Sequence, residues 1–238
     1  MMKFLMQFPT AFRPKKFTEC LSIYLDTYSG NHHLHFNIVC DADDDSMNTP
    51  EIVSKIEQMF NGKSNCSYDL YFDKDTTKIS AINSHINEIV DNYDIVYCVS
   101  DDMIPQVNDW DEIIVNAMQE NFPELDGCIH INTGDRDFWT DWTEVITLSI
   151  LGRELYKEFG YIYHPAYKSF YCDDEFSAIM HMKGKIFRID EKIIRHEHCQ
   201  HKNNRNSGTV DKGVEVNNKN WFIDQAMFNK RKAQGFPK

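Results

Sequence analysis

Short runs rich in Ile, Val, Leu, Phe and Tyr recur along the first half of the chain, each followed by apolar residues at helical spacing. The runs lie at about residues 3–8, 34–40, 68–72 and 94–99. Short continuous apolar runs are typical of strands buried on both faces, whereas apolar residues three and four apart are typical of amphipathic helices. Four repeats of strand and helix therefore predict an α/β fold, a mostly parallel central sheet flanked by helices.

The same spacing predicts the helices and the later strands. One helix opens at Arg13 and Pro14 and ends at Gly30, another begins at Thr49 and Pro50, and a third carries isoleucines at 79, 82, 86 and 89. Further helices are expected at 110–120, in the second half of 145–160, at 173–181 and at 221–232, and further strands at 127–132 and 185–190. The polar, Asn-rich stretch 202–219 predicts a loop.

Length and composition predict one large domain. With 238 residues, 42% of them hydrophobic, the chain can bury a substantial core. We expect the domain to span residues 1–200, with 201–238 forming a polar loop and a C-terminal helix packed on it. The net charge of −12, without a long Lys/Arg run, argues against extended nucleic-acid binding.

Cysteine usage and hydropathy indicate the compartment. The seven cysteines are scattered and include no Cys-x-x-Cys pair, which is typical of free thiols in a reducing environment. The apolar part of the first eight residues is too short for a signal peptide, and no apolar stretch approaches the roughly 18–20 residues of a membrane span. We therefore expect a cytoplasmic protein, in the host cytoplasm if it is viral.

Acidic and histidine clusters follow several of the predicted elements. They are Asp41/Asp43, Ser100/Asp101/Asp102, Asp173/Asp174/Glu175 and His196/His198. The first two follow parallel strands, whose carboxyl ends share the edge where open α/β sheets bind ligands. Carboxylates there suit Mg²⁺ or Mn²⁺. Each cluster alone also fits a solvated turn, a role that Asp fills well.

The ordered set of motifs resembles a known family. The segments are FPTAFRP at 8–14, VCDADD at 39–44, KISAIN at 78–83, VSDDMIP at 99–105, CDDEFS at 172–177 and RHEH at 195–198. Together they resemble the GT-A (Rossmann-like) fold of nucleotide-sugar glycosyltransferases, close to the family 2 group and its phage- and virus-like relatives. The resemblance covers about residues 4–200.

The resemblance implies a role for each motif. Donor nucleotide contacts are implied for Pro9, Thr10, Arg13, Asp41, Asp43, Lys78 and Asn83, with Asp101 beside the metal-binding motif. Asp102 corresponds to the acid that binds Mn²⁺ or Mg²⁺, and either His196 or His198 completes the metal shell. Ser100 stands where the family usually has its first Asp, which weakens a two-carboxylate grip. Asp173, or alternatively Asp174, corresponds to the catalytic base.

The function implied is metal-dependent transfer of a sugar, with inversion, from a nucleoside-diphosphate sugar of the UDP type. The acceptor is a hydroxyl of a glycan or another molecule. The chemistry needs a cation to neutralise the departing diphosphate and a carboxylate to take the acceptor proton. Two alternatives stay open: a non-catalytic carbohydrate-binding or virion-associated protein, and a nucleotidyltransferase. The latter would favour a Gly-rich phosphate loop, and the loop after the first strand has no glycine.

Overall fold

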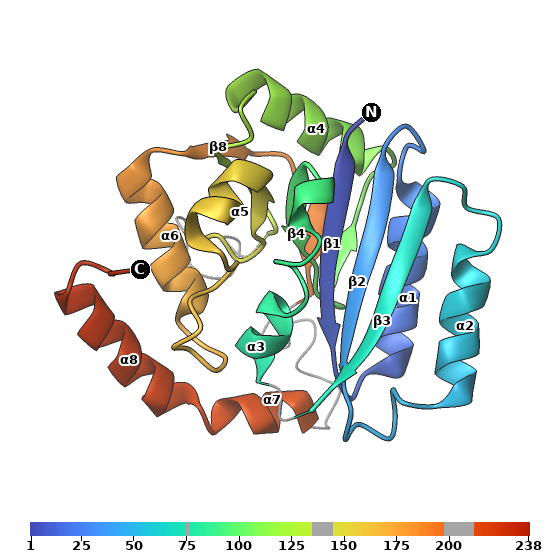
Figure 1. The fold of residues 1–238 in the computed structure, drawn as a ribbon, viewed down its shortest axis with the longest axis horizontal. Coiled ribbons are helices and arrows are strands. Elements are labelled where there is room, and N and C mark those ends of the chain that lie inside the picture. Colours follow the sequence, from blue (N-terminus) through green and yellow to red (C-terminus); the bar gives the residue numbers. More distant parts are fainter. Residues whose placement is uncertain (75–76, 135–144, 198–211) are drawn as a thin grey trace.

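A seven-stranded sheet forms the centre of the protein. The computed structural model describes residues 1–74, 77–134, 145–197 and 212–238, and the strand order is β3-β2-β1-β4-β7-β6-β8 (Figure 1). The strands are β1 (Lys3–Thr10), β2 (His33–Asp41), β3 (Cys66–Asp73), β4 (Ile95–Cys98), β6 (Cys128–Ile131), β7 (Ile150–Gly152) and β8 (Ile186–Ile189). The helices are α1 (Pro14–Thr27), α2 (Pro50–Phe60), α3 (Lys78–Asn83), α4 (Trp110–Asn121), α5 (Arg153–Phe159), α6 (Cys172–Lys183), α7 (Lys212–Asn218) and α8 (Trp221–Ala233).

The first four strands of the large sheet run parallel, as the sequence predicts. β1 pairs with β2 and with β4, and β2 pairs with β3, so their carboxyl ends share one edge of the sheet. That edge points down in Figure 1. β7 is antiparallel to both β4 and β6. A three-residue apolar strand carries no sequence signal for its direction, so the mixed half of the sheet could not be predicted.

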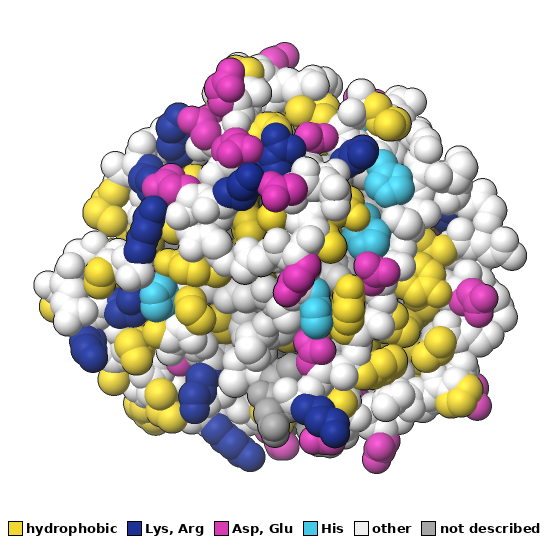
Figure 2. Space-filling view, viewed as in Figure 1, with side chains coloured by type: hydrophobic (Ala, Val, Ile, Leu, Met, Phe, Trp, Pro, Cys, Tyr) yellow, Lys and Arg dark blue, Asp and Glu magenta, His cyan; other side chains and the backbone are white. Residues whose placement is uncertain are grey.

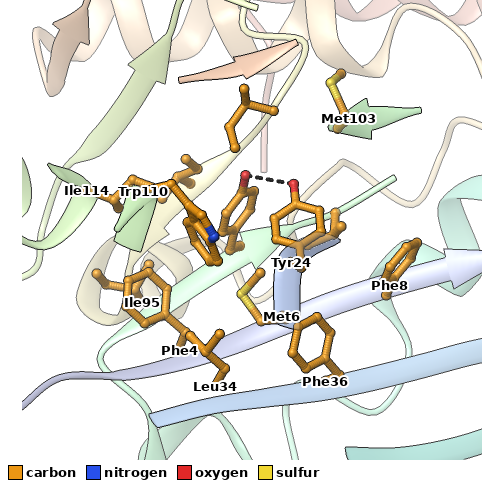
Figure 3. Close-up of a cluster of buried hydrophobic side chains, with 14 of the residues drawn as sticks. Phe4, Met6, Phe8, Tyr24, Leu34, Phe36, Ile95, Met103, Trp110 and Ile114 are labelled. Carbon is orange, nitrogen blue, oxygen red and sulfur yellow. Dashed lines mark hydrogen bonds between the residues drawn. The ribbon is translucent and has the colours of Figure 1, made fainter. Parts of the chain in front are cut away.

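Helices cover both faces of the sheet and make two apolar layers. One contains buried residues of α1, α2 and α4, and the other contains buried residues of α3, α5 and α6. In the first layer Trp110 is fully buried and packs edge-on against Tyr24 and Tyr97, whose hydroxyls are 3.0 Å apart (Figure 3). This bond satisfies the two tyrosine hydroxyls in the core, whereas the buried Trp110 Nε1 has no hydrogen-bond partner among the described residues.

A small second sheet lies apart from the large one. β5 (Met103–Pro105) pairs antiparallel with β9 (Ile194–His196), so that Met103 lies opposite His196. The sequence analysis did not predict β5. This pairing brings the chain following the fourth strand against a segment close to the end of the predicted 1–200 domain.

The predicted helix over residues 79–89 is shorter in the structure. α3 ends at Asn83, and His85 has a φ of 60°, which a helix cannot contain. The buried Gln7 and Asn37 amides donate to the carbonyl of Ser84, and Gln7 also donates to that of Ala81. These long-range bonds satisfy carbonyls that a continuing helix would use, and the isoleucine spacing does not reveal them.

The C-terminal region is more helical than the sequence indicates. Residues 212–218 form α7, although a loop was predicted for 202–219, and α8 packs against α6. Among the described residues, no helix has the length and apolar character needed to cross a membrane. Six cysteines are free and buried in the described part, as expected, whereas Cys199 lies outside it.

Candidate active site

The carboxyl end of β1 presents an unsatisfied polar group. Thr10 is 6% exposed, and its Oγ1 has no hydrogen-bond partner among the residues that the structure describes. Pro9, the residue before Thr10 in β1, lies opposite Val39 of β2. Burying a hydroxyl without a partner is unfavourable, so such an atom at a sheet edge is suited to a ligand.

Arg13 lies against the acidic pair that follows β4. Its Nη2 is 2.9 Å from Asp101 Oδ1, and its Nη1 is 3.9 Å from Asp102 Oδ2. The Asp101 side chain is 0% exposed, whereas that of Asp102 is 18% exposed. Ser100 Oγ donates to Asp102 Oδ1 over 2.6 Å. Asp101 is therefore the arginine's buried partner, and Asp102 is the carboxylate that a ligand can reach.

The β5–β9 ribbon brings His196 to Asp102. The backbone N–H of Glu197 donates to the carbonyl of Asp102 over 2.7 Å, and that of His196 donates to Thr133 over 2.9 Å. The His196 Nε2 then lies 3.9 Å from Asp102 Oδ2. The structure therefore brings together Asp102 and His196, two of the residues for which the resemblance implies metal binding, and metal binding itself stays a prediction. His198 lies outside the described residues.

Charges around Asp102 keep it ionised. Burial raises the pKa of Asp102, but His196, Arg13, the Ser100 hydroxyl and Lys78 together outweigh burial, and the pKa lies below its usual value. A partly exposed carboxylate with a lowered pKa is ionised at neutral pH, and the ionised form is the one that binds a hard cation.

The Asp102–His196 pair fits a divalent cation in part. Two donors 3.9 Å apart can share one Mg²⁺, since bonds to Mg²⁺ are about 2.0–2.1 Å long. Within the described residues, no cluster of three His, Cys, Asp or Glu side chains could hold a metal by itself. Mg²⁺ commonly takes one or two protein ligands and completes its shell with substrate phosphates and water, so this donor set suits an ion that arrives with a diphosphate.

The acidic stretch after β2 forms a tight turn. Asp41 ends the strand, and its Oδ1 accepts from the backbone N–H of Asp43, whose side chain is exposed. The neighbouring Asp44 is buried and accepts from the backbone N–H of Phe12 and from Ser46. Asp44 thus fixes the β1–α1 loop, which carries Arg13, against the β2 turn. Nucleotide contacts by Asp41 and Asp43 stay predictions.

Lys78 and Asn83 lie at the two ends of α3. Thr77 caps the helix reciprocally with Ser80, which orients its first residue, Lys78. Asn83 Oδ1 accepts from the backbone N–H groups of Ile162 and Tyr163, and its Nδ2 donates to the carbonyl of Tyr163. Asn83 therefore joins α3 to the loop after α5, and only one of its amide hydrogens is left for a nucleotide.

Asp173 and Asp174 lie in the first turn of α6. Both are partly exposed, and Asp173 Oδ1 accepts from the backbone N–H of Asp174 over 3.2 Å. Burial, with the neighbouring Asp173 charge, raises the pKa of Asp174 to about 6. Glu175 is buried and paired with Arg231, so it is not an available base.

Electrostatic influence links α6 to the Asp102 site. Burial raises the pKa of the Cys172 thiol, the Asp173 charge raises it further, and Lys78 partly opposes both. Lys78 also lowers the pKa of Asp102. The Lys78 ammonium therefore lies within electrostatic reach of both the β4 end and the α6 end of the candidate site.

A further polar cluster, which was not predicted from the sequence, lies at the end of β3. Asp73 pairs in register with Asp41, and its carboxylate is 3.0 Å from His85 Nε2. The His85 ring stacks on Tyr71, with centroids 3.9 Å apart and planes 9° from parallel. Figure 2 views the molecule from this side, where histidine and acidic side chains lie over β2 and β3. The available sequence signal was an Asp at the end of the third predicted strand, as Asp41 is at the end of the second.

Comparison with solved structures identifies the fold. No family model matches the sequence, and no curated protein is significantly similar to it. S. aureus TarS residues 1–349 match with a TM-score of 0.57 and 16% identity, over 82% of this chain and 60% of that one. The TarS complex with UDP matches at 0.59 and 14% identity, over 82% and 60% of the two chains. The complex with UDP-GlcNAc matches at 0.59 and 15% identity, over 88% and 62%.

This chain therefore spans about 60% of the length of the TarS fragment that it matches. These three TarS structures come from S. aureus and do not bear on phage- or virus-type relatives. The likeness covers the mostly parallel sheet and its flanking helices, and it confirms the predicted architecture. The chain has the GT-A fold.

Proposed function

We propose that this protein is a metal-dependent glycosyltransferase that moves a sugar from a UDP-sugar to an acceptor hydroxyl. The observation that carries the proposal is the pairing of Asp102 with His196, 3.9 Å apart, at the carboxyl edge of the sheet and beside Arg13. Phosphate oxygens need positive charge, and an acidic chain must supply it locally. TarS, which shares the fold, was solved with UDP and with UDP-GlcNAc.

The donor would lie across the carboxyl edge of β1, β2 and β4. Thr10 Oγ1 offers a buried hydroxyl that has no partner among the described residues, and Arg13 offers a cationic group beside Asp102. The Lys78 charge also lowers the pKa of Asp102. A Mn²⁺ or Mg²⁺ ion held by Asp102 and His196 would neutralise the diphosphate and thereby improve it as a leaving group. Asp41 and Asp73, which are in register at the ends of β2 and β3, would contact the uracil ring.

The Asp173–Asp174 pair would act as the base. As the acceptor oxygen forms its bond to the anomeric carbon, one carboxylate takes the acceptor's proton and the bond to the diphosphate oxygen breaks, releasing UDP. A base works best with a pKa close to the working pH, and the pKa of Asp174 is about 6. Attack opposite the leaving group inverts the anomeric centre, the stereochemistry that a single base on α6 suits.

A donor-turnover assay tests the proposal. Released UDP is measured with a panel of UDP-sugars and Mn²⁺, with and without a chelator, for the wild type and for Asp102→Asn. We expect metal-dependent UDP release by the wild type, lost in Asp102→Asn and retained in the matched control Asp126→Asn. Asp126 is a half-exposed carboxylate paired with Lys185, in the loop before β6.

If the wild type releases no UDP from any sugar nucleotide, yet binds a glycan, the protein is a carbohydrate-binding module. Joining of a nucleotide to an acceptor, with release of pyrophosphate, would instead identify a nucleotidyltransferase. Either outcome contradicts the proposal.

A further inference from the structure

The C-terminal helix α8 holds the loop that leads into α6. Asp224, on α8, is 0% exposed. Its Oδ1 accepts from the backbone N–H of Lys168 over 3.0 Å, and its Oδ2 accepts from those of Ser169 and Phe170 over 2.8 and 2.9 Å. Successive backbone N–H groups that converge on one carboxylate form a strong anion site. This loop conformation therefore depends on a residue more than fifty positions later in the chain.

A second anchor joins α8 to the first turn of α6. Arg231 Nε lies 2.8 Å from Glu175 Oε2, and its Nη2 lies 2.8 Å from Glu175 Oε1. The Tyr167 hydroxyl donates to the same carboxylate over 2.6 Å. The side chains of Arg231 and Glu175 are 9% and 2% exposed. A two-bond pair of this kind fixes direction as well as distance.

The two candidate catalytic carboxylates, Asp173 and Asp174, lie between the two anchors in the sequence. Tyr171, the residue before α6, has a φ of 61° and makes no side-chain capping bond to the helix. Its hydroxyl instead accepts from Gln225 Nε2 over 2.9 Å, and its ring stacks on Phe228 of α8. A non-glycine residue in the left-handed region needs support from its surroundings. Here α8 supplies that support through three sets of contacts with the start of α6 and the loop before it.

We propose that α8, through Asp224 and Arg231, positions the Asp173–Asp174 pair for the acceptor. Asp224 and Arg231 are positioning residues, since each acts through backbone or side-chain groups flanking the pair. This inference rests on the proposed function, because it assumes that the pair is the base. It extends the functional unit to the end of the chain, whereas the family resemblance stops near residue 200.

Hydrogen exchange tests the anchoring without any activity. In the wild type, the amides of Lys168, Ser169 and Phe170 should be protected from exchange, because they are released only when α8 undocks. In Asp224→Asn they should exchange at least about 10-fold faster. The matched control is Glu158→Gln, which removes a carboxylate that binds Lys238 and Lys183 without touching this loop. It should leave these rates unchanged.

Steady-state kinetics test the positioning. In Asp224→Asn and Arg231→Lys we expect kcat to fall roughly 10- to 100-fold, because small misplacements of a reacting group are costly. The donor KM should change less than about twofold, since the donor site is on other elements. Glu158→Gln should keep both constants.

The possible failures can be told apart. If the wild type turns over UDP-sugars and Asp224→Asn keeps its kcat, the positioning role is wrong and the proposed function stands. Amides at 168–170 that exchange in the wild type as fast as unstructured backbone also overturn the inference, and this observation holds even if a variant does not fold. If the wild type has no turnover on any UDP-sugar, the proposed function itself fails, and the positioning role fails with it.

Discussion

His196 Nε2 lies 3.9 Å from Asp102 Oδ2, although α4, α5, α6 and three strands of the large sheet separate the two residues in the sequence. The β5–β9 pairing imposes this proximity, because Met103 lies opposite His196 and the Asp102 carbonyl accepts the Glu197 N–H. The ribbon therefore brings two candidate cation donors together at the sheet edge from the middle and the late part of the chain.

Replacing the histidine should weaken metal-dependent donor binding. His196→Ala removes one of the two cation donors, and we expect the affinity for UDP with Mn²⁺ to fall at least about 10-fold, since even residues that only support metal ligands have effects of that size. UDP binding without metal should change little. Calorimetry measures both affinities, with His33→Ala as the control. His33 lies at the start of β2, where it bonds Ser67 of β3, at the opposite end of the strand from the candidate site. Equal metal-dependent affinity in His196→Ala and the wild type would exclude His196 as a ligand.

The reaction rate should depend on pH through the α6 pair. Burial, with the adjacent Asp173 charge, raises the pKa of Asp174 to about 6, and a protonated carboxyl cannot accept a proton. We expect kcat/KM of the wild type to rise with pH up to about 6 and then level off. UDP binding measured over the same range separates this effect from titration of the donor site. A rate that is flat between pH 5 and 7 would contradict a base of raised pKa.

The same carboxyl should affect stability with a defined sign. A folded-state pKa above the unfolded value means that the native protein holds the proton more tightly, so Asp174 costs stability as pH rises from about 4 to about 6. Asp174→Asn removes this cost. We expect its melting temperature to exceed that of the wild type by a few degrees at pH 7.5 and to equal it near pH 4. If the melting temperature of Asp174→Asn relative to the wild type is lower at pH 7.5 than at pH 4, the prediction is wrong.

Breaking the buried pair that joins α8 to α6 should be costly. Arg231→Met leaves the Glu175 carboxylate buried beside Tyr167 without its cation, which typically costs about 3–5 kcal/mol. The control Lys157→Met breaks an exposed pair with Asp91 and should cost far less, because solvent screens an exposed ion pair. Urea denaturation measures both. Similar small losses would mean that the Glu175–Arg231 contact does not hold α8 in place.

Much of the fold could be predicted because local hydrophobic patterns determine many of its elements. The runs at 3–8, 34–40 and 94–99 became β1, β2 and β4, because continuous apolar residues suit a strand covered on both faces. What could not be predicted depends on distant partners. β5 exists because β9 pairs with it, and α3 stops early because Gln7 and Asn37 use the carbonyl of Ser84.

The candidate site divides in the same way. The family resemblance implied that Asp102 has a late histidine, His196 or His198, as its partner, and the structure brings Asp102 and His196 together. Asp73 and His85 were missed because a single Asp after a third strand looks like any turn. Asp224 was missed since one acid on a predicted helix gives no sign that it accepts three backbone N–H groups from another element.

The most direct test of a cation-assisted donor site is the binding of UDP to the wild type and to Asp102→Asn, each titrated by calorimetry with and without Mn²⁺. We predict that Mn²⁺ tightens UDP binding to the wild type by at least about 10-fold and has no effect on Asp102→Asn. Tightening by Mn²⁺ that is equal in the two proteins, or absent from the wild type, would contradict the account.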